Sequence, residues 1–272
     1  MSSSLSFLKA IVFDWAGTVV DFGSCAPAAV FQKVFRERGI DITADQAREP
    51  MGMAKREHIE AILNMPSVRN RWKQAFSREF NDGDIDAMYE QFLPLQMQIL
   101  GEHSELIAGA ANAVQACRTM GLKIGSTTGY TRELMKVVSA AARLQGYEPD
   151  CVVCADDTPR GRPAPYLLFE AAKRMDVYPM WAIVKVDDTP VGIEAGRNAG
   201  CWTIGVTRTG NCVGKTQEEL AQLTATQVES LCRSAADKLL NAGAHYTVES
   251  VAEVPELLSK IDQQAANGKL PM

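Results

Sequence analysis

The 272-residue sequence lacks the features that usually mark membrane, nucleic-acid-binding and secreted proteins. No apolar run approaches the ~20 residues that a membrane-spanning helix needs. No block of lysines and arginines is present, and the net charge of −5 opposes a partner with a phosphate backbone. Lys9 and Asp14 flank the first apolar stretch, which does not fit a secretory signal peptide. We therefore expect a cytoplasmic protein that binds neither nucleic acid nor membrane.

Cysteine is present, but not in a pattern that builds a site. The seven cysteines, an odd number, lie at irregular spacing, which favours free thiols in a reducing compartment. Cys151 and Cys154 form one isolated C-x-x-C pair inside an apolar stretch, whereas a zinc site needs a second pair. We interpret this pair as buried packing, and the sequence assigns no role to Cys25.

One all-helical block separates the first predicted strand from all the others. Residues 10–13 form a short apolar run that is typical of a buried strand. Between residues 27 and 100, apolar residues recur at helical spacing and no strand-like alternation appears. Strands alternate with helices after this block, and we expect them at residues 122–126, 151–154, 182–186, 202–206 and 245–248.

This alternation indicates an α/β fold with a Rossmann-like, doubly wound parallel sheet. We expect residues 1–22 and 101–272 to form that core, with residues 23–100 inserted after the first strand as an all-helical cap domain. The apolar stripes of the cap helices form either the core of the cap or a subunit interface, and they favour a homodimer.

Several helix limits can be predicted from local patterns. Apolar side chains at four-residue spacing predict one helix through Val68, Trp72, Phe76 and Phe80. We expect Asp84 to cap the helix that follows. Two capping boxes predict later helix starts at Thr226 with Glu229 and at Ser250 with Glu253.

Chemically reactive or ligand-binding residues follow four of the predicted strands. Asp14 follows the first, and the second leads into Ser126-Thr127-Thr128-Gly129, whose hydroxyls and amide can hold a phosphate. Arg162 follows the third, and its guanidinium also suits phosphate. The fourth ends at Asp187-Asp188. Because the carboxyl ends of parallel strands form the ligand-binding edge of such a sheet, we expect these residues to meet there.

Acids from two of these strands allow more than one use. Two carboxylates with a backbone carbonyl form an oxygen-only site that suits Mg²⁺. Taken alone, Asp14 is either a nucleophile or the cap of the turn after its strand.

The order of these motifs resembles that of the haloacid dehalogenase superfamily of phosphoryl-transfer enzymes. The resemblance extends over the whole chain and includes the position of the helical insertion. Within the superfamily, four stretches are similar to those of the phosphonatase family: Phe13–Thr18, Pro50–Gly52 followed by Lys55 and His58, Ser126–Glu133, and Gly161–Pro163.

This resemblance implies a hydrolase that cleaves the carbon–phosphorus bond of phosphonoacetaldehyde to acetaldehyde and phosphate. Lys55 would form an imine (Schiff base) with the small-molecule phosphonate, and Asp14 would attack phosphorus to give an aspartyl phosphate. His58 would act as a proton shuttle. The alternatives are a phosphate-ester phosphatase or sugar phosphomutase of the same superfamily and, from another class, a non-catalytic phosphate-binding regulatory protein.

The resemblance also implies the remaining roles. The phosphoryl group would bind Thr128, Gly129 and Arg162, while Met51 and Tyr130 would line the aldehyde end. Mg²⁺ would bind Asp14, the backbone carbonyl of Ala16 and Asp188, with Asp187 as a second possibility. The superfamily commonly has glycine at position 187 and an acid at position 192. Here Asp187 and Gly192 stand instead, so the choice between the two acids stays open and we favour Asp188.

Two residues favour the lysine chemistry over ester hydrolysis. Related phosphatases have an acid two residues after the nucleophile, which protonates the leaving alcohol, but Ala16 occupies that position and cannot move a proton. A carbanion leaving group needs an electron sink instead, and an imine on Lys55 supplies one. Only a neutral amine attacks a carbonyl, so we expect burial, helped by Arg56, to lower the pKa of Lys55 by about 3 from ~10.4.

Overall fold

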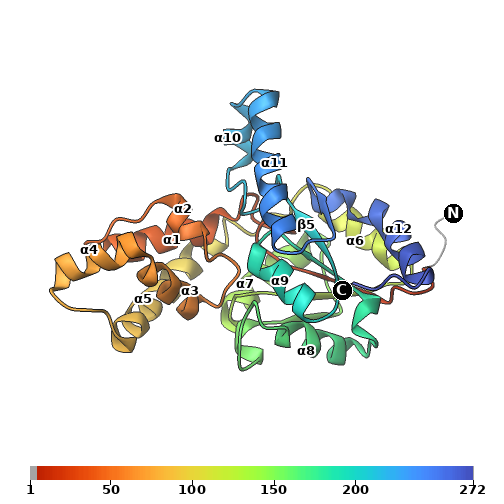
Figure 1. Cartoon of the computed structure of the whole chain (residues 1–272), viewed down its shortest axis with the longest axis horizontal. Coiled ribbons are helices and arrows are strands. Elements are labelled where there is room, and N and C mark those ends of the chain that lie inside the picture. The colour runs from red at the N-terminus through yellow and green to blue at the C-terminus, as the bar shows by residue number, and fades with distance from the viewer. Residues whose placement is uncertain (1–4, 272) are drawn as a thin grey trace.

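A six-stranded parallel sheet forms the core of the molecule (Figure 1). The structure is a computed structural model that describes residues 5–271, so the first four residues of the expected core lie outside it. The strands lie in the order β3-β2-β1-β4-β5-β6, and every neighbouring pair is parallel. Their bounds are β1 Ala10–Phe13, β2 Lys123–Thr127, β3 Cys151–Val153, β4 Ile183–Asp187, β5 Trp202–Val206 and β6 Tyr246–Val248. The α/β prediction is confirmed.

Helices cover both faces of this sheet. One face packs against α6 Ala110–Thr119, α7 Arg132–Leu144 and α12 Val254–Ala266. The other packs against α8 Tyr166–Met175, α9 Pro190–Asn198 and α11 Ala225–Asn241. The short helix α10 Gln217–Ala221 lies beside α11, and both project from the core in Figure 1. Short 3₁₀ turns span Ala155–Asp157, Met180–Ala182 and Val251–Glu253.

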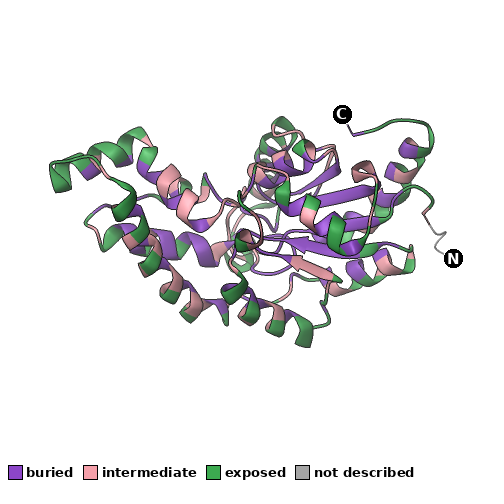
Figure 2. Ribbon diagram, turned by 90° about the horizontal axis from the view of Figure 1, so that it is seen from below, coloured by how far each residue is buried: buried purple, intermediate pink, exposed green. Residues whose placement is uncertain are grey.

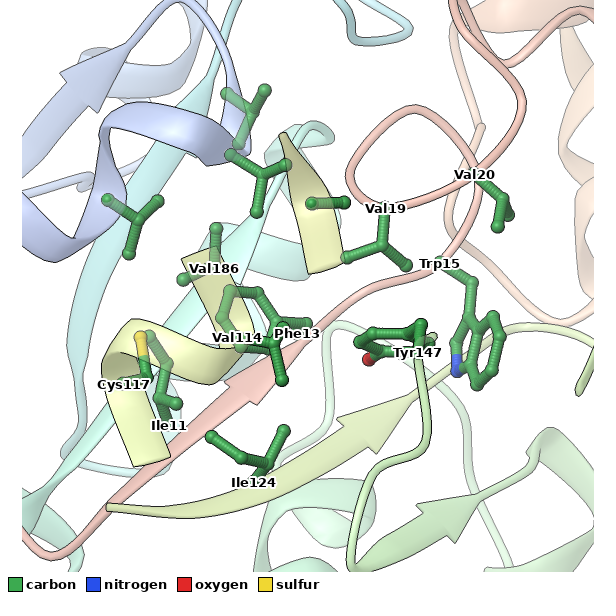
Figure 3. Close-up of a cluster of buried hydrophobic side chains, with 14 of the residues drawn as sticks. Ile11, Phe13, Trp15, Val19, Val20, Val114, Cys117, Ile124, Tyr147 and Val186 are labelled. Carbon is green, nitrogen blue, oxygen red and sulfur yellow. The ribbon is translucent and has the colours of Figure 1, made fainter. Parts of the chain in front are cut away.

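Strand β1 is apolar throughout because both of its faces are buried. Side chains alternate along a strand, so Ile11 and Phe13 enter one layer while Ala10 and Val12 enter the other. Figure 3 shows Ile11 and Phe13 among the side chains of the first layer, with Trp15 beside Tyr147.

The inserted block folds around an apolar cluster of its own. Its helices are α1 Cys25–Arg36, α2 Ala44–Arg48, α3 Lys55–Asn64, α4 Pro66–Phe76 and α5 Asp82–Leu100. The buried members of the cluster all fall between Ala28 and Phe92. Phe31, Phe35 and Trp72 are fully buried there, so these stripes form the interior of the cap. Figure 2 shows buried segments along the helices of the inserted block.

Two predicted details of the cap are wrong. Helix α4 ends at Phe76, because Ser77 adopts a left-handed conformation (φ 54°), and Phe80 lies beyond it. Its ring still packs on that of Trp72, with centroids 6.3 Å apart, which preserves the apolar spacing. Asp84 is not the cap of α5, since Asn81 holds that position and Asp84 completes the capping box three residues later.

Neither of the two later capping boxes forms as predicted. Thr224 caps α11 together with Gln227, which places Thr226 inside the first turn of the helix. The threonine two residues earlier therefore takes the role. The Ser250 hydroxyl accepts from the N–H of Ala252 and the Glu253 carboxylate accepts from that of Glu249, so the second box does not form. Ser250 begins the 3₁₀ turn that leads into α12.

Two segments of the chain connect the cap to the core and lie side by side, the first containing Val20 and Asp21 and the second His103 and Leu106. Residue Val20 of the first forms a β-bridge with Leu106 of the second, and Nδ1 of His103 lies 3.1 Å from Oδ1 of Asp21.

Among residues 5–271, no helix combines the length and the apolar character that crossing a membrane requires.

Candidate active site

Asp14 lies directly after β1 at the carboxyl edge of the sheet and is buried. Its N–H donates to the carbonyl of Val186 at 2.9 Å. The chain then turns at Gly17 (φ +83°), where a Cβ atom would lie 2.2 Å from Oδ2 of Asp188. Only glycine lets this turn pass so close to the second acid. The Asp14 side chain does not cap the turn, because its Oδ1 accepts a hydrogen bond from Arg162 at 2.6 Å.

Arg162 reaches Asp14 from the loop that follows β3, and it is buried. Its Nη2 also donates to the carbonyl of Thr127 at 2.7 Å and to its Oγ1 at 3.0 Å. Burial raises the pKa of Asp14, while the Arg162 charge opposes that rise. A guanidinium fixed beside a carboxylate can hold a phosphoryl group next to a nucleophile.

The predicted Ser126–Gly129 cradle is buried throughout, and only part of it lines the cavity. Ser126 accepts a hydrogen bond from Nε1 of Trp15 at 2.7 Å and so belongs to the core. The N–H of Thr128 donates to the carbonyl of Val153, and its hydroxyl accepts from the N–H of Tyr130 at 3.1 Å. Thr128 and Gly129 line the cavity beside Asp14, whereas Ser126 does not.

Three carboxylates converge at this edge of the sheet. Oxygens of Asp14, Asp187 and Asp188 lie within 4.8 Å of one another. Asp188 accepts from the Thr18 hydroxyl at 3.0 Å and from the Asn211 N–H at 2.7 Å, and it has no lysine or arginine partner among the described residues. Burial and the two neighbouring acids raise the pKa of Asp188 well above its ordinary value. A divalent cation would remove this cost, so the donor set fits Mg²⁺.

Asp187 differs from its neighbour in what it faces. Its Oδ2 lies 2.9 Å from Nζ of Lys185 and 3.4 Å from Nη1 of Arg162. Its Oδ1 accepts from the N–H and the hydroxyl of Thr189 at 3.0 and 2.7 Å. Burial acts to raise the pKa of Asp187, but the two cations outweigh it and lower that pKa. Asp188 is therefore the acid of the two that no lysine or arginine among the described residues neutralises.

Lys55 opens helix α3 and is buried between two aromatic rings. Its Nζ lies 5.0 Å from the ring centroid of Tyr130 and 5.5 Å from that of Phe31. Burial lowers the pKa of Lys55 from 10.5 to about 7. A large fraction of the amine is then neutral at physiological pH.

The expected help from Arg56 is wrong. Arg56 points to the surface of the cap, where it pairs with Asp82 at 3.0 Å and Asp86 at 2.6 Å. The positive charge that adds to the effect of burial on the Lys55 pKa is that of Arg162 across the cavity. Sequence neighbours on a helix point in different directions, so adjacency along the chain was misleading here.

His58 lies on the Lys55 face of α3 and is fully buried. Its ring stacks on that of Phe31, with centroids 3.8 Å apart. Nε2 lies 2.9 Å from the carbonyl of Ala47, which assigns the proton to Nε2 and leaves Nδ1 as an acceptor. Nδ1 has no hydrogen-bond partner among residues 5–271. Burial, together with the Lys55 charge, keeps the pKa of His58 well below its ordinary value, so the ring is neutral near pH 7.

One small cavity, with about 290 Å³ of empty volume, joins the cap and core groups. The predicted site residues that line it are Asp14, Ala16, Met51, Lys55, Thr128, Gly129, Tyr130 and Arg162. His58, Asp187 and Asp188 lie outside its wall. The cap sits tightly on the core here, since a Cβ atom at Gly129 would lie 2.6 Å from the carbonyl oxygen of Met53.

Several residues of this site are not apparent from the sequence motifs. Thr18 and Asn211 hold Asp188, although Asn211 is 23 residues from it along the chain. The Asn211 side chain also exchanges hydrogen bonds with Arg48 of the cap. Thr18 ends the Phe13–Thr18 stretch, although the sequence assigns it no role, whereas no local signal marks Asn211 or Arg48. Lys185 does carry one, because it is a charged residue within the apolar strand β4.

Comparison with known proteins identifies the family. Residues 8–200 match the model of the haloacid dehalogenase-like hydrolases. The chain is 41% identical over 267 residues to a phosphonoacetaldehyde hydrolase of Paraburkholderia phytofirmans, covering 98% of this chain and 100% of that one. It is 40% identical to the enzyme of that name from Bacillus cytotoxicus, over 94% of this chain and 97% of that one. The chain belongs to the phosphonoacetaldehyde hydrolase family of haloacid dehalogenase-like hydrolases.

A solved structure agrees with this assignment. The chain superimposes on a phosphonoacetaldehyde hydrolase-like protein from Oleispira antarctica with a TM-score of 0.95 and 38% identity, covering 99% of this chain and 98% of that chain. The fold class and the family inferred from the motifs are thereby confirmed. As a member of the phosphonoacetaldehyde hydrolase family, the chain is a hydrolase.

Proposed function

We propose that the chain hydrolyses the carbon–phosphorus bond of phosphonoacetaldehyde to acetaldehyde and phosphate through an imine on Lys55. The names of its relatives support the substrate. The observation that carries the proposal is the position of Lys55, a buried amine whose pKa is lowered to about 7, in one cavity with Asp14 and Arg162.

The residue two positions after Asp14 supports this chemistry over ester hydrolysis. Ala16 lines the cavity and has no proton to give, so an alcohol leaving group would depart without a general acid from this position. A carbon leaving group has no such need, because the electron pair of the carbon–phosphorus bond can move into an adjacent iminium group.

The neutral amine of Lys55 condenses with the aldehyde, takes up one proton and releases water, giving a protonated imine. A carboxylate oxygen of Asp14 bonds to phosphorus while the carbon–phosphorus bond breaks, and its electrons form an enamine on Lys55. Water then hydrolyses the aspartyl phosphate. Protonation and hydrolysis of the enamine release acetaldehyde and free Lys55.

Residues at the phosphoryl end would hold and neutralise the charged group. The Arg162 guanidinium, the Gly129 amide and the Thr128 side chain are available in the cavity for the phosphoryl oxygens. Asp14, Asp188 and the Ala16 carbonyl would hold Mg²⁺, with Asp187 directed toward protein cations instead. When bound, Mg²⁺ would neutralise charge between the nucleophile and the phosphoryl oxygens.

At the aldehyde end, Met51 and Tyr130 would enclose the carbon chain. His58 is suited to move protons during imine formation, because its Nδ1 is an unprotonated acceptor on the Lys55 face of α3. Its low pKa keeps it in this form near neutral pH.

Borohydride trapping tests the proposal. Phosphonoacetaldehyde with borohydride should leave a covalent adduct on Lys55, located by peptide mass spectrometry, while Lys55→Arg should give none. Free-phosphate release from sugar phosphates without an adduct would favour a phosphatase or phosphomutase. Binding of phosphate with no turnover of either kind would favour a regulatory protein.

The organisation of the chain beyond the site also belongs to this proposal. We infer a core formed by residues 1–22 and 101–272, a cap formed by residues 23–100, a cytoplasmic location and a homodimer. Light scattering on the purified protein measures the oligomeric state directly. A monomer mass at micromolar concentration would contradict the dimer.

A further inference from the structure

Strand β4 contains a lysine where a buried strand is expected to be apolar. Lys185 is fully buried. Its Nζ lies 2.9 Å from Oδ2 of Asp187 and donates to Oγ1 of Thr127 at 3.1 Å and to the carbonyl of Val186 at 3.2 Å. Lys185 therefore makes two hydrogen bonds and one ion pair, whereas Oδ2 of Asp187 has no hydrogen-bond partner among residues 5–271.

The neighbouring helix is shaped to admit this pair. Lys185 and Asp187 are two residues apart and so share one face of β4. Helix α9 presents Gly192 and Gly196, four residues apart on one of its own faces. A Cβ atom at Gly192 would lie 2.0 Å from Cγ of Asp187, and one at Gly196 would lie 3.1 Å from Cβ of Lys185. Gly192 therefore makes room for the Asp187 carboxylate, and Gly196 makes room for Thr203, whose Cγ2 would lie 2.5 Å from the added Cβ, as well as for Lys185.

The pair is joined to the phosphoryl end of the site through two shared groups. Asp187 Oδ2 faces Nη1 of Arg162 at 3.4 Å as well as Lys185. Thr127 Oγ1 accepts from both Arg162 and Lys185. Asp187 thus holds Arg162 through Nη1, while Nη2 of Arg162 contacts both Thr127 and Asp14.

We propose that Lys185 and Asp187 are positioning residues that fix the Arg162 guanidinium against Asp14 and the phosphoryl group. Lys185 neutralises Asp187, so that Asp187 can orient Arg162 without drawing its charge away from the reacting end. Neither residue touches substrate. This inference rests on the proposed function, because it assigns the pair to the phosphoryl end of that site.

The variant Asp187→Asn separates positioning from simple electrostatics. Removing a negative charge near an anion site should tighten phosphate binding if only Coulomb attraction matters. Under the proposal the variant weakens phosphate binding by about tenfold or more, because Arg162 loses its charged anchor and faces an unpaired Lys185. The probe is inorganic phosphate, titrated by calorimetry with Mg²⁺ present.

Two further variants change the Lys185–Asp187 pair in other ways, one by removing both charges and one by displacing the carboxylate. Lys185→Met combined with Asp187→Asn removes the unpaired cation, and it should bind phosphate more tightly than Asp187→Asn alone. Gly192→Ala keeps both charges but displaces the Asp187 carboxylate, so it should also weaken phosphate binding by about tenfold. Lys123→Met, on β2, which β1 separates from β4, and Gly101→Ala, with no atom within 4 Å of its added Cβ, are the matched controls.

The outcomes separate this inference from the proposed function. Borohydride trapping at Lys55 tests the imine, and it should persist in every variant because imine formation lies at the aldehyde end. Unchanged or tighter phosphate binding in folded Asp187→Asn overturns the positioning role, as does weakened Mg²⁺ binding with phosphate affinity intact. If Asp187→Asn does not fold, Gly192→Ala decides, and unaltered phosphate affinity in that variant overturns the role.

Discussion

The aromatic enclosure of Lys55 should set the pH dependence of the reaction. Burial lowers the pKa of Lys55 from 10.5 to about 7, which corresponds to about 5 kcal/mol against the charged form. At pH 7 about half of the amine would then be neutral, against roughly one part in three thousand for a lysine of pKa 10.5. Opening the enclosure to water should reverse part of this effect.

The perturbation is Phe31→Ala, since the Phe31 ring lies 5.5 Å from the Lys55 amine. The matched control is Phe35→Ala, one turn along the same helix and equally buried in the cap interior. Both lose packing, at a cost of about 3–5 kcal/mol. Only Phe31→Ala should hydrate the amine.

The assay is kcat/KM from phosphate release between pH 5.5 and 9. In the wild type it should rise about tenfold per pH unit below pH 7 and level off above it, because only the neutral amine attacks the aldehyde. Phe31→Ala should move the midpoint upward by about one pH unit or more, while Phe35→Ala leaves it near 7. A wild-type midpoint near 10, or the same midpoint in both variants, would refute the reasoning.

The same pKa difference predicts a change in folding stability. The folded chain releases the Lys55 proton near pH 7, whereas the unfolded chain keeps it until about pH 10.5. The unfolded state therefore binds more protons between these values, and stability rises with pH across that window. Lys55→Met should stabilise the protein most below pH 7, and the gain should fade toward pH 10. Urea unfolding at several pH values measures this, and a gain that did not vary with pH would contradict it.

Three other predictions follow from single contacts. Asp14→Asn should abolish phosphate release while still allowing an adduct at Lys55, and normal release would disprove the nucleophile assignment. Gly52→Ala should lower kcat/KM by about tenfold or more with the core still folded, because Gly52 has φ +97° and an added Cβ would lie 2.5 Å from a hydroxyl of the opposing core loop. Arg48→Ala should lower the free energy of unfolding by about 1–3 kcal/mol, because Arg48 donates to the carbonyls of Gly23 and Ser24 and to the side-chain oxygen of Asn211. The control Arg36→Ala removes only an exposed ion pair and should change that free energy by less than about 0.5 kcal/mol.

The sheet and the main residues of the site could be predicted because a parallel sheet gathers its strand ends. The apolar run before Asp14 indicates a buried strand, and the carboxyl-end rule brings Asp14 next to the loops that carry Thr128 and Arg162. The order of strands in the sheet is not needed for that inference. The helical block is equally predictable, because its apolar spacing persists over many turns.

Contacts made across long sequence distances could not be predicted. Asn211 binds Asp188 through its N–H and Arg48 through its side chain, so it connects the acid edge of the core to the cap. Its own sequence surroundings are those of an ordinary loop. The wrong expectation for Arg56 has a related cause, since helical geometry turns it away from Lys55 and toward acids of another helix.

The choice between Asp187 and Asp188 shows how much a simple periodicity can decide. Adjacent residues at a strand end point to opposite sides, so the two acids have different hydrogen-bond and ion-pair partners even though their oxygens lie within 4.8 Å of one another. Asp187 is the last residue of β4, and its side chain lies on the same face of the strand as that of Lys185. The side chain of Asp188 instead contacts Thr18 and lies against the turn at Gly17. A buried lysine two residues before an acid therefore predicts an ion pair on that face. The acid that follows is left without a cation, and it is the one that a metal ion would neutralise.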